Sequence, residues 1–157
     1  MDINNYLDMG PEHSSPESSG IAVIPVPFDK TSSWKKGADR GPAAIIEASA
    51  YLELYDIETG GDVYEKGIYT HKEAVDVSTV ESMTDSVEAT AGSYLDAGKF
   101  PVVLGGNHSV SIGAVRAASH RYNDLTVLQL DAHTDLRDTY EGSPLSHACV
   151  MARIKEC

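Results

Sequence analysis

The sequence has few cysteines, no long apolar run and little positive charge, and each shortage excludes a class of protein. Its two cysteines, Cys149 and Cys157, are too few for a disulfide framework and indicate a reducing compartment. It has no run of about 18 apolar residues, so no membrane-spanning helix is expected. With 12 basic against 24 acidic residues, its net charge of −12 argues against sequence-independent nucleic-acid binding.

The first 19 residues are polar and acidic, without the basic start and apolar core of a signal peptide. We therefore interpret residues 1–19 as a flexible N-terminal tail and residues 20–157 as the folded part. Together with the cysteine usage, this predicts a cytoplasmic protein with no membrane partner. The acidic balance is compatible with a small cationic substrate, because the field of the protein would attract it.

Apolar runs alternate with helical patterns after the tail. Short apolar runs predict strands at 21–26, 67–71, 100–104 and 125–130, and the stretches between them predict helices at 42–50, 79–97 and 109–121. Pro25 lacks a backbone N–H, which places it at a strand end or at a sheet edge. Nearly continuous apolar strands alternating with helices are typical of a parallel sheet with helices on both faces, so the expected class is α/β.

Two of these strands end in side chains that bind metals. The strand at 100–104 runs into Gly-Gly-Asn-His-Ser, and the strand at 125–130 runs into Asp-Ala-His-Thr-Asp. The carboxyl ends of parallel strands meet at one rim, where ligands gather. In an extended backbone, alternate residues of the second motif also point to one side. The predicted ligands are His108, Asp131, His133 and Asp135.

Each motif alone has an ordinary structural explanation. The segment 131–135 could be a polar turn or a helix cap, and His108 could be a capping or packing histidine. Their joint position after two buried strands favours a metal site instead. Oxygen and nitrogen donors without thiolate favour Mn²⁺ or a similar ion, with Zn²⁺ and Fe²⁺ as alternatives. The other histidines before His147 have no such setting and are interpreted as surface or core residues: His13, His71 and His120.

These motifs resemble those of the ureohydrolase family, which includes arginase, agmatinase and formimidoylglutamase. Both signatures occur in the family's order and at about its spacing, and residues 27–45 and 131–147 resemble agmatinases in particular. The resemblance covers residues 20–157 and implies the N-terminal part of a ureohydrolase domain with an arginase-like three-layer fold. It also implies a hydrolase that cleaves agmatine to putrescine and urea, a step of polyamine biosynthesis, and a homo-oligomer.

The resemblance assigns roles to the site residues. Two Mn²⁺ ions are implied, with His108 and Asp135 on one ion, His133 on the other and Asp131 bridging both. His147 matches the family histidine that shuttles a proton to the leaving amine or orients the substrate. Asp135 would also hold the proton of the attacking water, which makes Asp135 and His147 the predicted catalytic residues.

Two departures from the family pattern leave alternatives open. Position 107 is Asn where the family usually has an acidic residue, and Asn107 is expected to tune activity. The family's later Ser-x-Asp-x-Asp motif and its guanidinium-binding glutamate are absent, so the chain is expected to hold only half of the ligand set. The alternatives are a ureohydrolase for guanidinobutyrate, guanidinopropionate, arginine or aminopropylagmatine, and a non-catalytic metal-binding fragment or pseudo-enzyme. Zinc deacetylases of related fold also use an Asp-x-His pair, but the Gly-Gly-Asn-His-Ser segment argues against them.

Overall fold

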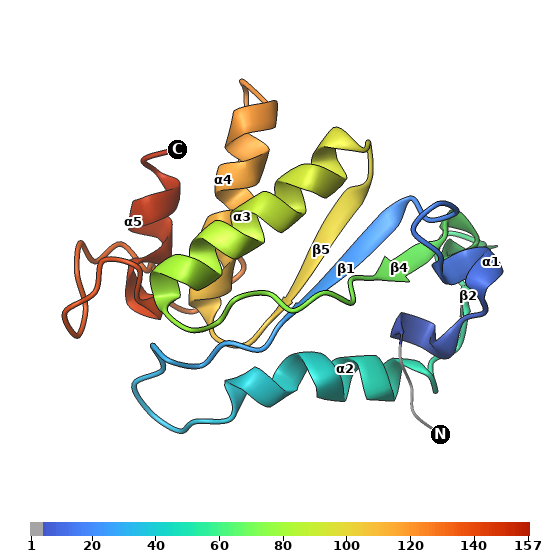
Figure 1. The fold of residues 1–157 in the computed structure, drawn as a ribbon, viewed down its shortest axis with the longest axis horizontal. Coiled ribbons are helices and arrows are strands. Elements are labelled where there is room, and N and C mark those ends of the chain that lie inside the picture. Colours follow the sequence, from blue (N-terminus) through green and yellow to red (C-terminus); the bar gives the residue numbers. More distant parts are fainter. Residues whose placement is uncertain (1–4) are drawn as a thin grey trace.

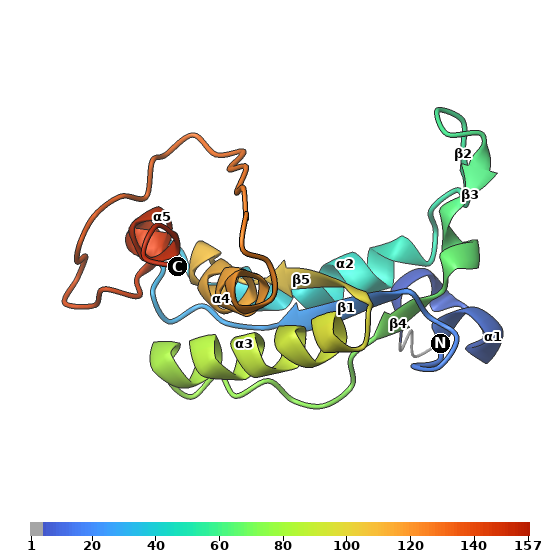
Figure 2. The same cartoon turned by 90° about the horizontal axis from the view of Figure 1, so that it is seen from above.

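A parallel sheet lies at the centre of the structure, a computed structural model that describes residues 5–157 (Figure 1). Its strands lie in the order β4 (Ile68–Thr70), β1 (Ile21–Val26) and β5 (Phe100–Gly105), and both pairs are parallel. Helix α2 (Gly41–Ser49) covers one face and α3 (Val80–Asp96) covers the other (Figure 2). The α/β class and these five elements confirm the prediction from the sequence.

The remaining elements flank this sheet. Helix α4 (Ser111–Arg121), also predicted, packs along α3, and the short α5 (Val150–Ile154) packs against α4. A small antiparallel hairpin joins β2 (Tyr55–Asp56) to β3 (Gly61–Asp62). No helix in residues 5–157 is long and apolar enough to cross a membrane. The other helical segments are α1 (Pro11–Ser14) and 3-10 turns at Tyr6–Asp8, Ala38–Arg40, Val63–Lys66, His108–Val110 and His147–Cys149.

Helix α3 forms where the helical spacing of apolar residues predicted it. Its buried side chains recur at helical spacing and form a core with Ile24 and Val26 of β1. At its start, Thr79 Oγ1 accepts a hydrogen bond from Ser82 N at 3.0 Å, which satisfies a backbone donor of the first turn. After its last turn, Gly98 has a φ of +73°, the left-handed conformation that ends many helices.

Pro25 lies in the central strand rather than at a sheet edge, yet its missing N–H leaves no gap in the hydrogen bonding. Pairing between β1 and β4 stops at Val23, whose carbonyl accepts from His71 N at 2.8 Å. Two residues farther along the strand, Pro25 faces the same side, where β4 has already ended. Pro25 is thus near the carboxyl end of β1 but not at a sheet edge, and it is tolerated because β4 is shorter than β1.

The strand predicted at 125–130 does not form, and this prediction is wrong. These residues are in neither helix nor strand, and Leu128 and Leu130 are 81% and 90% exposed. Within residues 5–157, β5 pairs with β1 alone and no strand lies beside 125–130. Because no neighbouring strand is available, the backbone of residues 125–130 forms no strand-to-strand hydrogen bonds in spite of its apolar sequence.

The N-terminal segment, predicted to be a flexible tail, makes defined contacts in the described part of the chain. Residues 1–4 lie outside the described residues, but residues 5–19 pack on the sheet and on α2. Tyr6 N donates to Thr70 Oγ1 and Leu7 N donates to Ser49 Oγ, both at 2.8 Å. The Lys99 ammonium donates to the carbonyl of Pro16 at 2.6 Å. Hydroxyl groups of residues far along the chain accept hydrogen bonds from this polar segment. The composition of the segment itself does not reveal such partners.

Two glycines on the facing helices α3 and α4 should respond oppositely to alanine. A Cβ at Gly113 would lie 2.3 Å from the Thr84 carbonyl oxygen, so Gly113→Ala should lower the free energy of unfolding by about 1–3 kcal/mol. A Cβ at Gly92 would meet Ala117 at an ordinary 3.9 Å. Gly92→Ala should therefore raise stability by up to about 1 kcal/mol, because alanine favours helices. Urea unfolding followed by circular dichroism measures both, and equal losses would contradict the close helix contact.

Candidate metal centre

Three of the four predicted ligands come together where β5 ends. The His108 Nδ1 atom lies 2.8 Å from Asp135 Oδ2 and 3.4 Å from Asp131 Oδ2. One ligand atom from each of the three residues lies within 4.8 Å of the others. The motif after residues 100–104 and the motif after residues 125–130 therefore come together as expected, even though residues 125–130 form no strand.

The turn that presents His108 depends on a close backbone approach. Gly106 N donates to the Val26 carbonyl and Asn107 N donates to the Phe28 carbonyl, both at 3.0 Å. A Cβ at Gly106 would lie only 1.9 Å from the Phe28 oxygen, so this position requires glycine. The Asn107 side chain then accepts from Ser109 N at 3.2 Å and begins the 3-10 turn that carries His108.

The Asn107 side chain also connects the metal-binding turn to a loop far earlier in the sequence. Its Nδ2 donates to Thr31 Oγ1 at 2.8 Å and to Ser32 Oγ at 3.3 Å. Thr31 Oγ1 lies 2.8 Å from the hydroxyl of Ser109, which is fully buried. Sequence reasoning assigned a tuning role to Asn107 but did not identify Thr31 or Ser32, because nothing in their local sequence marks them.

Asp29 holds the same loop in shape. Its carboxylate accepts from the Ser32 hydroxyl and from the backbone N–H groups of Gly37 and Ala38. Burial works against the charged form, but these hydrogen bonds outweigh it and hold the pKa of Asp29 below its usual value of 3.8. The loop beside His108 is thus organised around a single carboxylate.

The backbone of the Asp-Ala-His-Thr-Asp motif bends at Ala132 and His133 and is not a regular extended segment. His133 N donates to Asp131 Oδ1 at 2.8 Å, and this bond contributes most to lowering the pKa of Asp131. Asp135 has a φ of +47°. The His133 ring lies beside Asp131, with Nδ1 at 3.1 Å from Oδ1, but 81% of its side chain is exposed. His133 is thus adjacent to the cluster and not part of it.

His147 lies on the wall of a neighbouring cavity of about 330 Å³. The cavity is lined by His133 and Asp135 from the metal-binding motif and by His147 from the 3-10 turn before α5. The predicted catalytic residues thus border one space. Arg137 and Tyr140 also line it, and sequence reasoning did not select either as a site residue.

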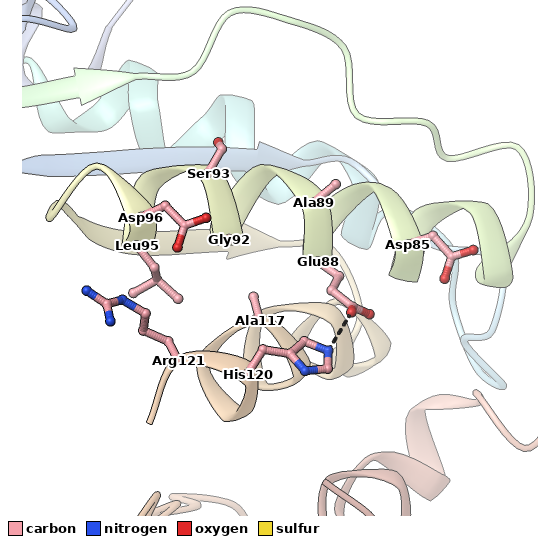
Figure 3. Close-up of a pocket in the computed structure, with 10 residues that line it drawn as sticks. All are labelled: Asp85, Glu88, Ala89, Gly92, Ser93, Leu95, Asp96, Ala117, His120 and Arg121. Atoms are coloured by element: carbon pink, nitrogen blue, oxygen red, sulfur yellow. Dashed lines mark hydrogen bonds and ion pairs between the residues drawn. The ribbon is translucent and has the colours of Figure 1, made fainter. Parts of the chain in front are cut away.

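A second cavity, of about 570 Å³, lies between α3 and α4 and shares no residue with the centre (Figure 3). There His120 Nε2 lies 3.1 Å from Glu88 Oε1, and 74% of the His120 side chain is exposed. His71 is largely buried, with Nδ1 at 2.8 Å from Tyr94 Oη. Both fit the surface and core roles predicted for them. Cys149 is buried, which raises the pKa of its thiol and fits a packing role.

The donor set decides which ions fit. Two carboxylates and one imidazole, with no sulfur, suit hard to borderline divalent cations. Three side chains fill half of the roughly six positions that an octahedral ion requires. The described residues can therefore hold a metal ion but leave much of its coordination to other groups.

Comparisons with known proteins agree with the geometry. The model of the arginase family matches residues 19–157. The N(1)-aminopropylagmatine ureohydrolase of Synechocystis sp. is 38% identical over 145 residues, which cover 88% of this chain and 47% of that protein. The agmatinase of Bacillus anthracis is 37% identical over 146 residues, with 90% and 49% covered.

Solved structures show the same relationship. The agmatine ureohydrolase of Thermoplasma volcanium matches with a TM-score of 0.78 at 36% identity, over 89% of this chain and 47% of that one. The chain spans about half the length of the curated relatives it matches. Its fold, its convergent histidine and aspartates, and these relatives lead to one conclusion: the chain belongs to the arginase family.

Proposed function

We propose that this chain forms part of a ureohydrolase active site that cleaves the guanidinium group of agmatine to give urea and putrescine. The observation that carries the proposal is the cluster of His108, Asp131 and Asp135 beside a cavity bordered by His147. Relatives named agmatinase and N(1)-aminopropylagmatine ureohydrolase support guanidino hydrolysis. Their two names differ in the far end of the substrate. The resemblance around Phe28, Asp29 and His147 favours agmatinase over arginase, and we propose agmatine as the substrate to be tested against aminopropylagmatine.

The proposed metal is manganese. His108 and Asp135 would hold one ion, His133 would hold a second, and Asp131 would be shared between them. Bound there, manganese would supply the positive charge that lowers the pKa of water and makes it a nucleophile near neutral pH. The position of His133 next to Asp131 supports this sharing, because the His133 ring lies against the Asp131 carboxylate, with Nδ1 at 3.1 Å from Oδ1.

The protein's own groups would then handle protons and orientation. A carboxylate oxygen of Asp135 accepts a hydrogen bond from the attacking water and orients it toward the guanidinium carbon. As the bond from that carbon to the alkyl amine breaks, the His147 ring donates a proton to the departing nitrogen. The net charge of −12 favours a cationic substrate. The same proposal places the reaction in polyamine biosynthesis, in the cytoplasm, within a homo-oligomer.

The test is urea release by this chain after loading with Mn²⁺. Agmatine, N(1)-aminopropylagmatine, arginine and guanidinobutyrate are compared, and the highest kcat/KM is expected for agmatine. His147→Gln should keep the manganese content and lower kcat by about 100-fold or more. His120→Gln, on the exposed face of α4, is the matched control and should match the unmodified chain.

The other outcomes identify the alternatives. Manganese binding without urea from any substrate would favour a non-catalytic metal-binding fragment. Higher turnover of aminopropylagmatine would replace the substrate but keep the reaction. About one zinc ion per chain together with deacetylation of an acetylated amine would overturn the proposal.

A further inference from the structure

The segment that carries His147 folds back on the metal-binding motif. Arg137 N donates to the Ala148 carbonyl at 3.3 Å, and Ala152 N donates to the Asp135 carbonyl at 3.1 Å. These bonds close a loop between Asp135 and Ala152. The distance between His147 and the metal-binding motif is therefore set by contacts made within the loop itself.

A tight turn at the tip of this loop places Tyr140. Tyr140 and Ser143 exchange two backbone hydrogen bonds, each of 3.1 Å. Glu141 and Gly142 between them have φ values of +49° and +83°. Positive φ at both central residues is characteristic of a type I′ turn, the two-residue connection that best fits the twist of a hairpin. The turn returns the chain toward His147 with Tyr140 beside it.

The Tyr140 ring contacts both the catalytic candidate and a cation. Its centroid lies 5.5 Å from that of the His147 ring, with the two planes at 90°. The Arg137 guanidinium carbon lies 4.9 Å from the Tyr140 centroid, over the ring. Edge-to-face rings and cation–π contacts both favour one relative orientation. The hydroxyl of Ser146, 3.3 Å from His147 Nδ1, comes from the adjacent residue and is a weaker restraint on the imidazole.

We propose that Tyr140 is a positioning residue for His147 and that Arg137 holds the Tyr140 ring in place. The inference rests on the proposed function, because Tyr140 acts only through the proton that His147 transfers. The aromatic ring makes both contacts, whereas the phenol hydroxyl makes neither. Phenylalanine at position 140 should therefore preserve the orientation of His147, whereas leucine should not.

Nuclear magnetic resonance tests the positioning directly in the metal-free chain. The unmodified chain and Tyr140→Phe should show nuclear Overhauser effects between the ring at 140 and the His147 ring. In Tyr140→Leu, the His147 ring signals should move to positions typical of a freely rotating side chain. Tyr51→Leu, which removes a tyrosine that is 84% exposed elsewhere, is the control and should leave the His147 signals unchanged.

Kinetics then test the consequence for catalysis. With manganese bound, Tyr140→Leu should lower kcat for agmatine about tenfold, with KM and manganese content unchanged, and Tyr140→Phe should restore it. Absence of the ring–ring effect in the unmodified chain would overturn the proposal. So would a Tyr140→Leu chain that keeps both its kcat and its His147 signals. A chain that shows the ring–ring effect but releases no urea would refute the proposed function and leave the ring placement established.

Discussion

Asp131→Ala is expected to remove most of the manganese that the chain binds. The Asp131 carboxylate faces two imidazoles, with Oδ2 at 3.4 Å from His108 Nδ1 and Oδ1 at 3.1 Å from His133 Nδ1. Its loss therefore affects both proposed ions. Changes to residues that only support a metal ligand already weaken binding by about 10- to 100-fold, so loss of a shared ligand should cost at least about 100-fold. Isothermal titration with Mn²⁺ and metal analysis after dialysis measure the effect.

The controls separate this role from a general loss of negative charge. Asp124→Ala removes an exposed carboxylate seven positions earlier and should leave manganese affinity unchanged. His133→Ala should have a smaller effect than Asp131→Ala, because the His133 ring lies outside the three-residue cluster. Unchanged manganese affinity in Asp131→Ala would contradict the assignment of the centre.

Gly106→Ala should destabilise the chain by about 3 kcal/mol or more and displace His108. The new methyl group would lie 1.9 Å from the Phe28 oxygen and 2.8 Å from its carbonyl carbon. Both are backbone atoms next to the end of the buried β1, so a change of side-chain rotamer cannot relieve the clash. The turn must open, which breaks the hydrogen bond from Asn107 N to the Phe28 carbonyl. Thermal and urea unfolding give the loss of stability, and manganese titration gives the accompanying loss of affinity.

Gly61→Ala provides the matched control. Gly61 lies in the small hairpin, and a Cβ there would meet no atom within 4 Å. This variant should change the free energy of unfolding by no more than about 0.5 kcal/mol. A Gly106→Ala chain as stable as Gly61→Ala, with normal manganese affinity, would show that the turn tolerates a side chain.

Much of the fold and the centre of the candidate site could be predicted from the sequence. The apolar runs of β1 and β5 and the periodic pattern of α3 specify buried strands and a helix, because burial of a face imposes a spacing on the residues that form it. The motif containing His108 follows β5, at the carboxyl end of the parallel sheet, where ligands gather. The motif containing Asp131 reaches the same rim, as expected, although the apolar run before it forms no strand.

The tertiary structure decided what depends on partners far away in the chain. Residues 125–130 have the composition of a strand but form none, because a strand requires a neighbour to pair with. Asn107 binds Thr31, and residues 5–19 are held by hydroxyls such as Thr70 Oγ1. The Tyr140 ring stands against His147 because a turn folds the loop back. Composition and spacing determine local backbone preference and burial, whereas these contacts exist only once folding has brought distant segments within a few ångströms of one another.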